Sequence, residues 1–317
     1  MDSPESSTFS EFLSRFAQKR IAIATHNRAD VDAISSAFAL SKILPNSTIC
    51  TNEEMSEGAK QLTERLMIPV SDLAALEKSQ FEGLVVCDTS AYTLLPAAKD
   101  WKILLIIDHH RSDGRVMKSD MLIVDESSPS CAEIIANLVP KEKIDKSAAF
   151  GLCVGMIADG ARFKSARMET FQTLAKMMEI AGASYSELLG YAEPEPKMEA
   201  KLAILKAMKK VDYIYAAGYV IATTETDSNE SDSASLISEA ADVAFVAKWK
   251  DFEKETRISA RARKSVLVPL NKVMSEVGKA LGGAGGGHPK AAGAALKAHT
   301  DEALKKCVET FILFAEK

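Results

Sequence analysis

The chain has 317 residues, of which 47% are hydrophobic, 26% charged and 6% aromatic, a composition that excludes a collagen, a coiled coil and a mostly disordered chain. Its length is about twice that of a typical domain, so we expect two domains. The formal charge of −5, from 39 basic and 44 acidic side chains, argues against a protein that coats nucleic acid with a basic surface.

Short apolar runs alternate with helical patterns through the first 190 residues. Strands are expected at residues 21–24, 48–50, 84–87, 103–107 and 121–124. Helices are expected at residues 32–44, 53–66, 131–138, 147–157 and 168–181. This alternation predicts an α/β fold with a doubly wound, mostly parallel sheet, in which ligands bind at the carboxyl ends of the strands.

Two prolines and two glutamates between residues 191 and 196 predict a linker, which we place at residues 191–198. The expected domains are residues 1–190 and a smaller α+β domain at residues 199–317, with a cleft between them. The elements expected after residue 196 are helices at 197–210, 266–280 and 301–316, strands at 213–223, 242–249 and 255–262, an acidic turn at 227–233 and a glycine-rich loop at 282–287.

Five cysteines are scattered along the chain without a CxxC pair. This pattern argues against a disulfide framework or a thiolate zinc site and fits a reducing compartment. Residues 1–11 contain no apolar run, and the longest aliphatic run, at residues 103–107, is too short to span a bilayer. We therefore expect a cytoplasmic protein with no membrane partner.

Aspartates and histidines follow the ends of the predicted strands. They are His26, Asp30 and Asp32 after the first strand, Asp88 after the third, Asp108, His109 and His110 after the fourth, and Asp159 after the helix at 147–157. Because the carboxyl ends of parallel strands share one edge of the sheet, these groups can converge on one site. Oxygen and imidazole ligands without thiolates favour Mn²⁺, Mg²⁺ or Co²⁺ over structural zinc.

Each of these residues alone has an ordinary structural interpretation. Asp88 would serve as the N-cap of the helix that follows it, and either Asp30 or Asp32 would cap the next helix after the first strand. Asp159 would be a turn residue. Caps do not require His-x3-Asp-x-Asp and Asp-His-His in one chain, and three ionisable groups directly after five aliphatic residues are costly to bury without a functional partner. The combined pattern therefore predicts a metal site.

This series of residues resembles the DHH phosphoesterase superfamily. The run Gly-Gly-Gly-His-Pro-Lys-Ala-Ala-Gly at residues 285–293 resembles the signature of the first type of DHH-associated C-terminal domain. The resemblance extends from near residue 20 to near residue 296, and the short linker is similar to that of the nanoRNase and pAp-phosphatase branch. It implies a DHH metal-binding catalytic domain followed by a DHH-associated substrate-binding domain.

The resemblance implies a pair of divalent cations, with Mn²⁺ favoured and Mg²⁺ or Co²⁺ as alternatives. His26 and Asp30 would hold one cation. Asp32, His109 and Asp159 would hold the other. The one carboxylate that would bridge both cations is Asp88.

Two further residues of the Asp-His-His run have implied catalytic roles. Asp108 would orient the adjacent histidines, and His110 would contact the scissile phosphate or the leaving group. The family usually has Asp-Thr-Gly before an aromatic residue, whereas here Asp159 is followed by Gly-Ala-Arg-Phe at residues 160–163. The turn chemistry after this aspartate therefore differs from the family pattern.

The substrate-binding residues implied for the second domain are Arg261, Gly286, Gly287 and His288. Arg261 matches the family's substrate-phosphate arginine, and a guanidinium suits bidentate contact with phosphate. A glycine-rich run allows backbone N–H groups to approach a phosphate in a nest, although a flexible hinge is the alternative for such a run alone.

The implied activity is hydrolysis of short oligonucleotides (nanoRNA) to nucleoside monophosphates, with pAp phosphatase activity at the same site. The alternatives are a phosphodiesterase for linear or cyclic dinucleotides such as pApA or c-di-AMP, a polyphosphatase, a single-strand exonuclease, and a catalytically inactive replication-associated scaffold. Few aromatic residues lie near the motifs, which favours a short RNA or small nucleotide as partner. A homodimer is compatible with the sequence.

Overall fold

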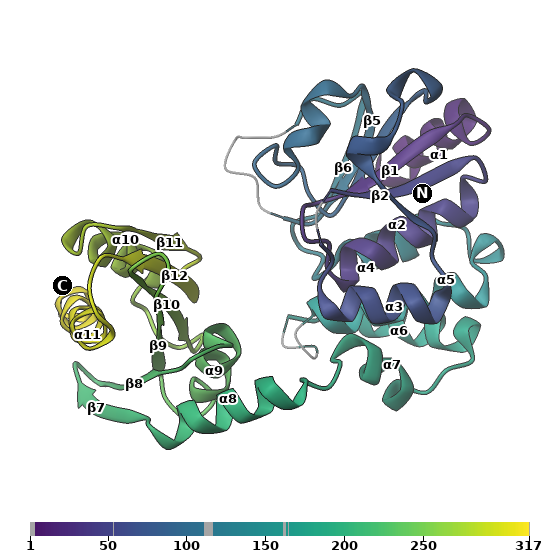
Figure 1. Ribbon diagram of the computed structural model, residues 1–317. Coiled ribbons are helices and arrows are strands. Elements are labelled where there is room, and N and C mark those ends of the chain that lie inside the picture. The colour runs from purple at the N-terminus through teal and green to yellow at the C-terminus, as the bar shows by residue number, and fades with distance from the viewer. Residues whose placement is uncertain (1–3, 53, 111–116, 161–162, 164, 317) are drawn as a thin grey trace. The chain divides into compact units, whose positions relative to one another are not determined.

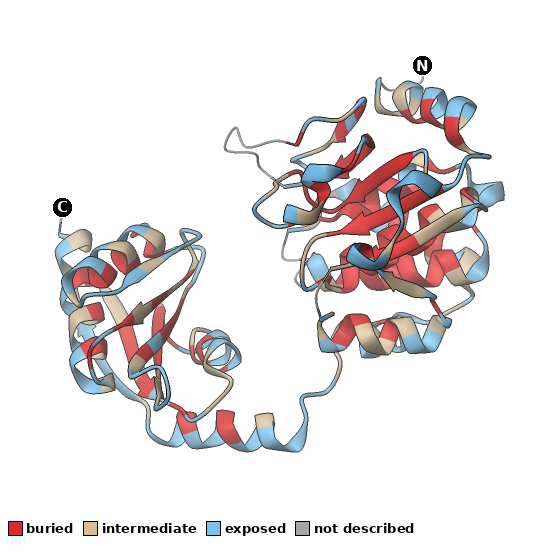
Figure 2. Cartoon of the chain, turned by 45° about the horizontal axis from the view of Figure 1, so that its top comes forward, coloured by how far each residue is buried: buried red, intermediate tan, exposed pale blue. Residues whose placement is uncertain are grey.

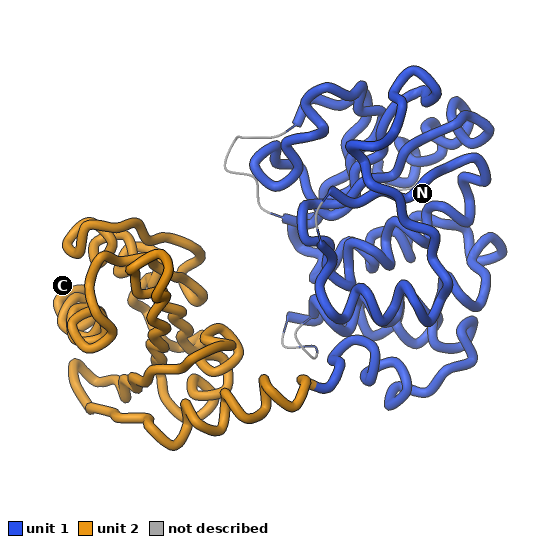
Figure 3. The backbone as a smooth tube through the Cα atoms, viewed as in Figure 1, with its two compact units in different colours: residues 1–195 blue, residues 196–317 orange. Residues whose placement is uncertain are grey.

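The computed structural model describes residues 4–52, 54–110, 117–160, 163 and 165–316. The chain forms two compact units, Met1–Glu195 and Pro196–Lys317 (Figure 3). Helix α7 (Tyr185–Ala192) ends, and helix α8 (Met198–Lys209) begins, within the segment expected to be a linker. No helix in the described part of the chain is long and apolar enough to cross a membrane, and all five cysteines are free and buried.

The first unit contains a six-stranded sheet in the order β3-β2-β1-β4-β5-β6, with parallel pairing throughout (Figure 1). Its strands are β1 (Ile21–Thr25), β2 (Ser47–Thr51), β3 (Val70–Asp72), β4 (Gly83–Cys87), β5 (Ile103–Asp108) and β6 (Met121–Val124). The other helices are α1 (Pro4–Phe16), α2 (Val31–Ile43), α3 (Glu57–Leu66), α4 (Cys131–Leu138), α5 (Lys146–Asp159) and α6 (Met168–Ala181). The predicted α/β fold is confirmed.

The central strands β1, β4 and β5 are buried along their whole length, as Figure 2 shows in red. Side chains of α2, α4 and α5 pack in the larger core cluster on one face of the sheet. The other face is covered by short 3-10 turns, which contribute Leu73 and Ala98, and by Trp101. Strands covered on both faces have no need of polar positions, which explains their continuous apolar sequences.

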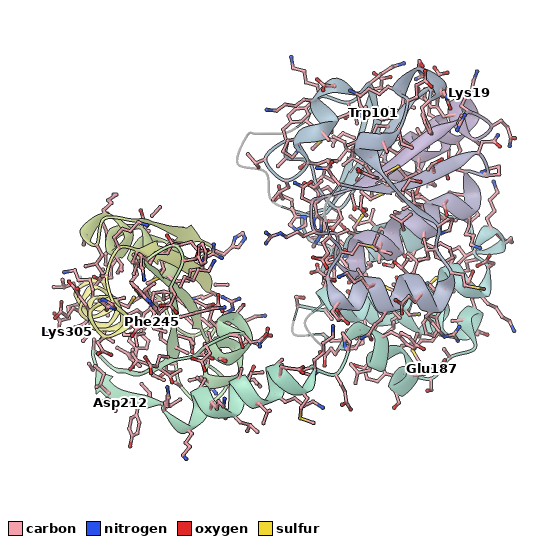
Figure 4. All side chains as sticks on the ribbon, in the orientation of Figure 1. Lys19, Trp101, Glu187, Asp212, Phe245 and Lys305 are labelled. Atoms are coloured by element: carbon pink, nitrogen blue, oxygen red, sulfur yellow. The ribbon has the colours of Figure 1, made fainter. Side chains whose placement is uncertain are left out.

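The second unit contains a mixed sheet in the order β11-β12-β10-β9-β8-β7, in which only β8 and β9 pair in parallel. Its strands are β7 (Asp212–Ala216), β8 (Tyr219–Glu225), β9 (Val243–Lys250), β10 (Glu255–Ala262), β11 (Ala284–Gly287) and β12 (Ala291–Leu296). The remaining helices are α9 (Glu230–Ile237), α10 (Leu270–Ala280) and α11 (Thr300–Ala315). In Figure 4, Phe245 lies inside this unit, while Asp212 and Lys305 project outward.

Four expected elements of the second unit are wrong in detail, and the fourth, the glycine-rich loop at residues 282–287, contains β11. The single strand expected at residues 213–223 is a hairpin, because Ala217 and Gly218 both adopt positive φ and reverse the chain. The acidic turn contains the start of α9. The helix expected from residue 266 begins at Leu270, because Pro269 stands at its N-cap.

The strand order of the first unit reverses between β1 and β4, which are neighbours although β2 and β3 lie between them in the chain. In sheets of this kind, ligands bind outside the carboxyl ends of the strands at the point of reversal. His26 follows β1 and Asp88 follows β4 directly, so the fold places both residues at this point.

Candidate metal centre

A first group of possible ligands lies at the carboxyl ends of β1 and β4. The Nε2 atom of His26 lies 3.4 Å from Asp88 Oδ2 and 3.8 Å from Asp30 Oδ2. The Nδ1–H of His26 donates to the Asn27 carbonyl at 2.7 Å, which leaves Nε2 directed at the two carboxylates. Asp30 also caps α2 by accepting a hydrogen bond from Ala33 N at 3.0 Å, so its two oxygens have separate roles.

A second group combines His109, which directly follows β5, with residues of α2 and α5. The Nε2 atom of His109 lies 3.2 Å from Asp159 Oδ2 and 3.3 Å from Asp88 Oδ1. The ligand atoms of Asp32, His109 and Asp159 all lie within 4.8 Å of one another. The Nδ1–H of His109 donates to the Ser128 carbonyl at 3.2 Å, which selects Nε2 as the atom facing the carboxylates. No motif in the sequence points to Ser128, which acts here through its backbone carbonyl.

Asp32 is fully buried in the first turn of α2. Its Oδ2 accepts a hydrogen bond from Cys131 N at 2.7 Å, and its Oδ1 accepts one from Ala132 N at 2.9 Å. The N-terminus of α4 therefore holds this carboxylate from a site about 100 residues away in the chain. Each oxygen retains a second lone pair, so the contacts leave the carboxylate able to bind a cation.

Asp88 connects the two groups because its Oδ2 faces His26 and its Oδ1 faces His109. Its backbone is left-handed, with φ 63°, a strained conformation for a residue with a Cβ that is found most often at functional sites. The buried atoms Asp88 Oδ1 and His109 Nε2 have no hydrogen-bond partner among the described residues. Orphaned oxygen and nitrogen atoms that face each other fit a divalent cation between them.

The hydrogen bonds of Asp108 differ from those expected. Its Oδ1 accepts from His109 N at 2.8 Å, His110 N at 3.1 Å and His110 Nδ1 at 2.9 Å. Asp108 thus orients the ring of His110, whereas the ring of His109 is oriented by Ser128. The His110 side chain is 51% exposed, so its Nε2 is accessible to a bound substrate.

The electrostatics of the centre favour cations. Burial opposes the charge on His26, but the facing carboxylates of Asp30 and Asp88 outweigh burial and raise the pKa of His26 to about 11. Burial also opposes the charge on His109, whose pKa rises to about 9 because Asp88 and other carboxylates surround it. Burial raises the pKa of Asp159 to about 6. A cation bound at the imidazole Nε2 atoms would displace the protons held there.

Arg261 lies in β10, where its guanidinium contacts polar groups of the second unit. Its Nη2 donates to Ser231 Oγ at 2.7 Å, and its Nη1 donates to the Ala260 carbonyl at 3.0 Å. Ser231 and Ser259 line a surface hollow of about 480 Å³ together with Gly286. Ser231, which accepts a hydrogen bond from Arg261, and the predicted glycine Gly286 therefore line the same hollow.

Gly286 and Gly287 lie in an extended strand, so the loop expected at residues 282–287 is wrong for residues 284–287. A nest requires successive N–H groups to converge, whereas those of a strand point alternately to opposite sides. Gly285 in the same strand has a packing reason, because a Cβ at this position would overlap the Met274 carbonyl of α10. A Cβ at Gly286 would meet open space, which keeps the hollow accessible.

His288 is exposed in the turn between β11 and β12, and its backbone N donates to the Ala291 carbonyl at 2.8 Å. Ala291 is paired in register with Arg261. His288 and Arg261 therefore lie at the same end of the second sheet. The altered turn expected after Asp159 includes residues 161 and 162, which lie outside the described residues.

Carboxylates and imidazoles grouped at the carboxyl edge of a parallel sheet define a class of α/β proteins that bind divalent cations there. The chain matches the model of the DHH family N-terminal domain over residues 20–156 and that of the DHHA1 domain over residues 214–317. These ranges together span most of the chain, which belongs to the DHH phosphoesterase superfamily. It is a metal-dependent phosphoesterase.

The chain is 29% identical over 310 residues to the uncharacterized protein MJ0988 of Methanocaldococcus jannaschii, a match that covers 93% of this chain and 92% of that protein. Its fold is similar to that of an exopolyphosphatase-related protein from Bacteroides fragilis, with a TM-score of 0.78, 16% identity and coverage of 98% and 96%. RecJ from Thermus thermophilus, solved with Mn²⁺, has a TM-score of 0.56, 12% identity and coverage of 98% and 54%.

Proposed function

We propose that this phosphoesterase uses two divalent cations, with Mn²⁺ preferred, to hydrolyse short oligonucleotides to nucleoside monophosphates. The observation that carries the proposal is the position of Asp88, which has one oxygen facing each group of possible ligands. The proposed ligands are His26 and Asp30 for one cation, Asp32, His109 and Asp159 for the other, and Asp88 for both.

The bound cations would act as Lewis acids, lower the pKa of a water molecule and neutralise charge on the phosphate oxygens. The proposed role of His110 is to hydrogen-bond the scissile phosphate or the leaving oxygen through Nε2. Its hydrogen bond to Asp108 raises the pKa of His110 and favours the protonated ring. Asp108 is fully buried, so the imidazole is held from a fixed position in β5.

A short substrate is supported by the hollow of the second unit. Its volume of about 480 Å³ is within the range of small-molecule sites, and Ser231 and Ser259 on its wall also accept hydrogen bonds from Arg261. We propose that Arg261, Gly286, Gly287 and His288 bind the part of the substrate remote from the scissile bond. The same contacts suit pAp, which also carries two phosphates on one nucleoside.

A substrate panel with Mn²⁺ tests the proposal: RNA of two to twenty-four nucleotides, matching DNA, pAp, pApA, c-di-AMP and polyphosphate. We expect kcat/KM for RNA of two to five nucleotides to exceed that for the 24-mer by at least about tenfold, or about 1.4 kcal/mol. Higher kcat/KM for polyphosphate than for every nucleotide, or equal rates for the 2-mer and the 24-mer, would contradict the proposed substrate class.

Removal of divalent cations is expected to lower the thermal stability of the first unit. The carboxylates of the centre lie close together, so cations that bind only the folded state stabilise it. At a free Mn²⁺ concentration a hundredfold above Kd, each ion adds about 2.7 kcal/mol to the free energy of unfolding. Thermal melts in EDTA and in graded Mn²⁺, at constant ionic strength, measure the effect. An unchanged Tm over the whole range would show that the site binds no cation.

Replacement of Arg261 is expected to impair substrate binding more than the chemical step. The variant Arg261→Ala removes the guanidinium beside the hollow, so we expect KM to rise about tenfold or more while kcat changes less than about threefold. The preference for two to five nucleotides should weaken as well. Arg263→Ala is the matched control, because the guanidinium of Arg263 donates to the carbonyls of Ser238 and Glu239. Unchanged KM and length preference in Arg261→Ala would exclude the proposed contact.

A further inference from the structure

Arg167, at the N-cap of α6, joins three polar groups of the first unit outside the metal centre. Its Nη2 lies 2.9 Å from Glu133 Oε1 in α4 and 3.7 Å from Asp125 Oδ2 after β6. Its Nη1 donates to Ser127 Oγ at 2.5 Å. One guanidinium therefore ties α6 to both ends of the segment 125–133.

The segment 125–133 provides the backbone groups that orient two proposed metal ligands. The Ser128 carbonyl accepts the Nδ1–H of His109. The amides of Cys131 and Ala132 donate to the carboxylate of Asp32. These backbone groups lie between the points at which Arg167 holds the segment, so its position sets the direction of both ligands.

The contact with Glu133 is costly for a purely structural element. Glu133 is fully buried, and within the described part of the chain neither its Oε2 nor the buried Nε of Arg167 has a hydrogen-bond partner. The Arg167 side chain is 33% exposed, so the ion pair joins a buried carboxylate to a partly exposed guanidinium. A buried carboxylate with an unsatisfied oxygen is often less stabilising than an apolar side chain of similar volume. The guanidinium also contacts Ser127 and Asp125, and an apolar side chain could not make these polar contacts.

We propose that Arg167 is a positioning residue for the metal centre. It holds the segment 125–133 so that the Ser128 carbonyl keeps His109 Nε2 directed at the cation, and so that the amides of α4 hold Asp32. The inference rests on the proposed two-cation function and assigns the effect to one cation, the one bound by Asp32, His109 and Asp159. The cation bound by His26 and Asp30 lies outside its reach.

The variant Arg167→Met tests the inference by titration of the metal-free protein with Mn²⁺ in a calorimeter. We expect one of the two sites to weaken by about 10- to 100-fold, as is typical when a residue supporting a metal ligand is lost. The other site should change by less than about threefold. Saturating Mn²⁺ should restore kcat in Arg167→Met, because the ligands themselves remain.

A double variant separates positioning from stability. Arg167→Met alone leaves Glu133 buried without its partner and should lower Tm. The double variant Glu133→Met/Arg167→Met removes both charges and should recover Tm, but not the weakened Mn²⁺ site, because the connection to Ser127 remains absent. Recovery of both Tm and Mn²⁺ affinity would show a structural ion pair only and would overturn the inference.

Two further comparisons complete the test. Arg65→Ala is the control. Arg65 Nη2 lies 3.9 Å from Glu187 Oε1, and neither residue belongs to the metal centre. We expect the Mn²⁺ affinities of this variant to equal those of the wild type. If Arg167→Met does not fold, Ser127→Ala removes one contact of the guanidinium and should still weaken one site selectively. If Arg167→Met, or Ser127→Ala in its place, bound Mn²⁺ at both sites with wild-type affinity, the positioning role would be refuted. A wild type that binds no Mn²⁺ would instead refute the proposed function.

Discussion

The variant Asp88→Asn is expected to lower kcat/KM for every phosphodiester by at least about a thousandfold, or about 4 kcal/mol of transition-state stabilisation. Asp88 is the residue whose two oxygens face both groups of possible ligands, so its loss should affect both proposed cations. An amide retains one oxygen acceptor but no charge, and it places an N–H₂ donor where the second cation would bind.

The substitution isolates charge from backbone geometry. Asp88 has φ 63°, and asparagine is among the residues that best tolerate a left-handed backbone. Asp72→Asn at the end of β3, the edge strand of the same sheet, is the matched control, because Asp72 caps a 3-10 turn away from the ligands and its replacement should leave kcat/KM unchanged. Steady-state kinetics and Mn²⁺ titration measure both variants. Residual activity of Asp88→Asn above a tenth of wild type would contradict the shared-ligand arrangement.

The variant Gly155→Ala is expected to destabilise the first unit by about 1–3 kcal/mol and to weaken Mn²⁺ binding. A Cβ at this position of α5 would overlap Ser35 Oγ, and it would lie 2.9 Å from Ala132 Cβ and 3.0 Å from Asp32 Oδ1. The methyl group therefore pushes against α2 and α4 at the carboxylate they share. A single added methyl should cost both stability and metal affinity.

Gly190→Ala in α7 is the control for this substitution. A Cβ at Gly190 has no atom within 4 Å, and alanine is favoured over glycine in a helix, so we expect equal or higher stability, by up to about 1 kcal/mol. Urea unfolding and Mn²⁺ titration of both variants measure the difference. If Gly155→Ala were as stable and bound Mn²⁺ as tightly as wild type, close packing of α5 at Asp32 would not support the metal centre.

Much of the first unit was predictable because its local pattern and its tertiary environment agree. The runs that became β1, β4 and β5 are apolar at every position, as strands covered on both faces must be. The second unit was less predictable. The hairpin at Ala217 and Gly218 depends on positive φ, and β11 is a glycine-containing edge strand that the sequence pattern does not distinguish from a loop.

The sequence by itself identified the candidate metal ligands, because most of these Asp and His residues follow buried strands and can face only one edge of a parallel sheet. Only the tertiary structure decided how those side chains are oriented. Ser128, Cys131 and Ala132 act through backbone groups, which every residue type has, so no pattern of side chains reveals them. Arg167 meets Glu133 across 34 positions of sequence, and only the packing of α4 against α6 brings the two charges together.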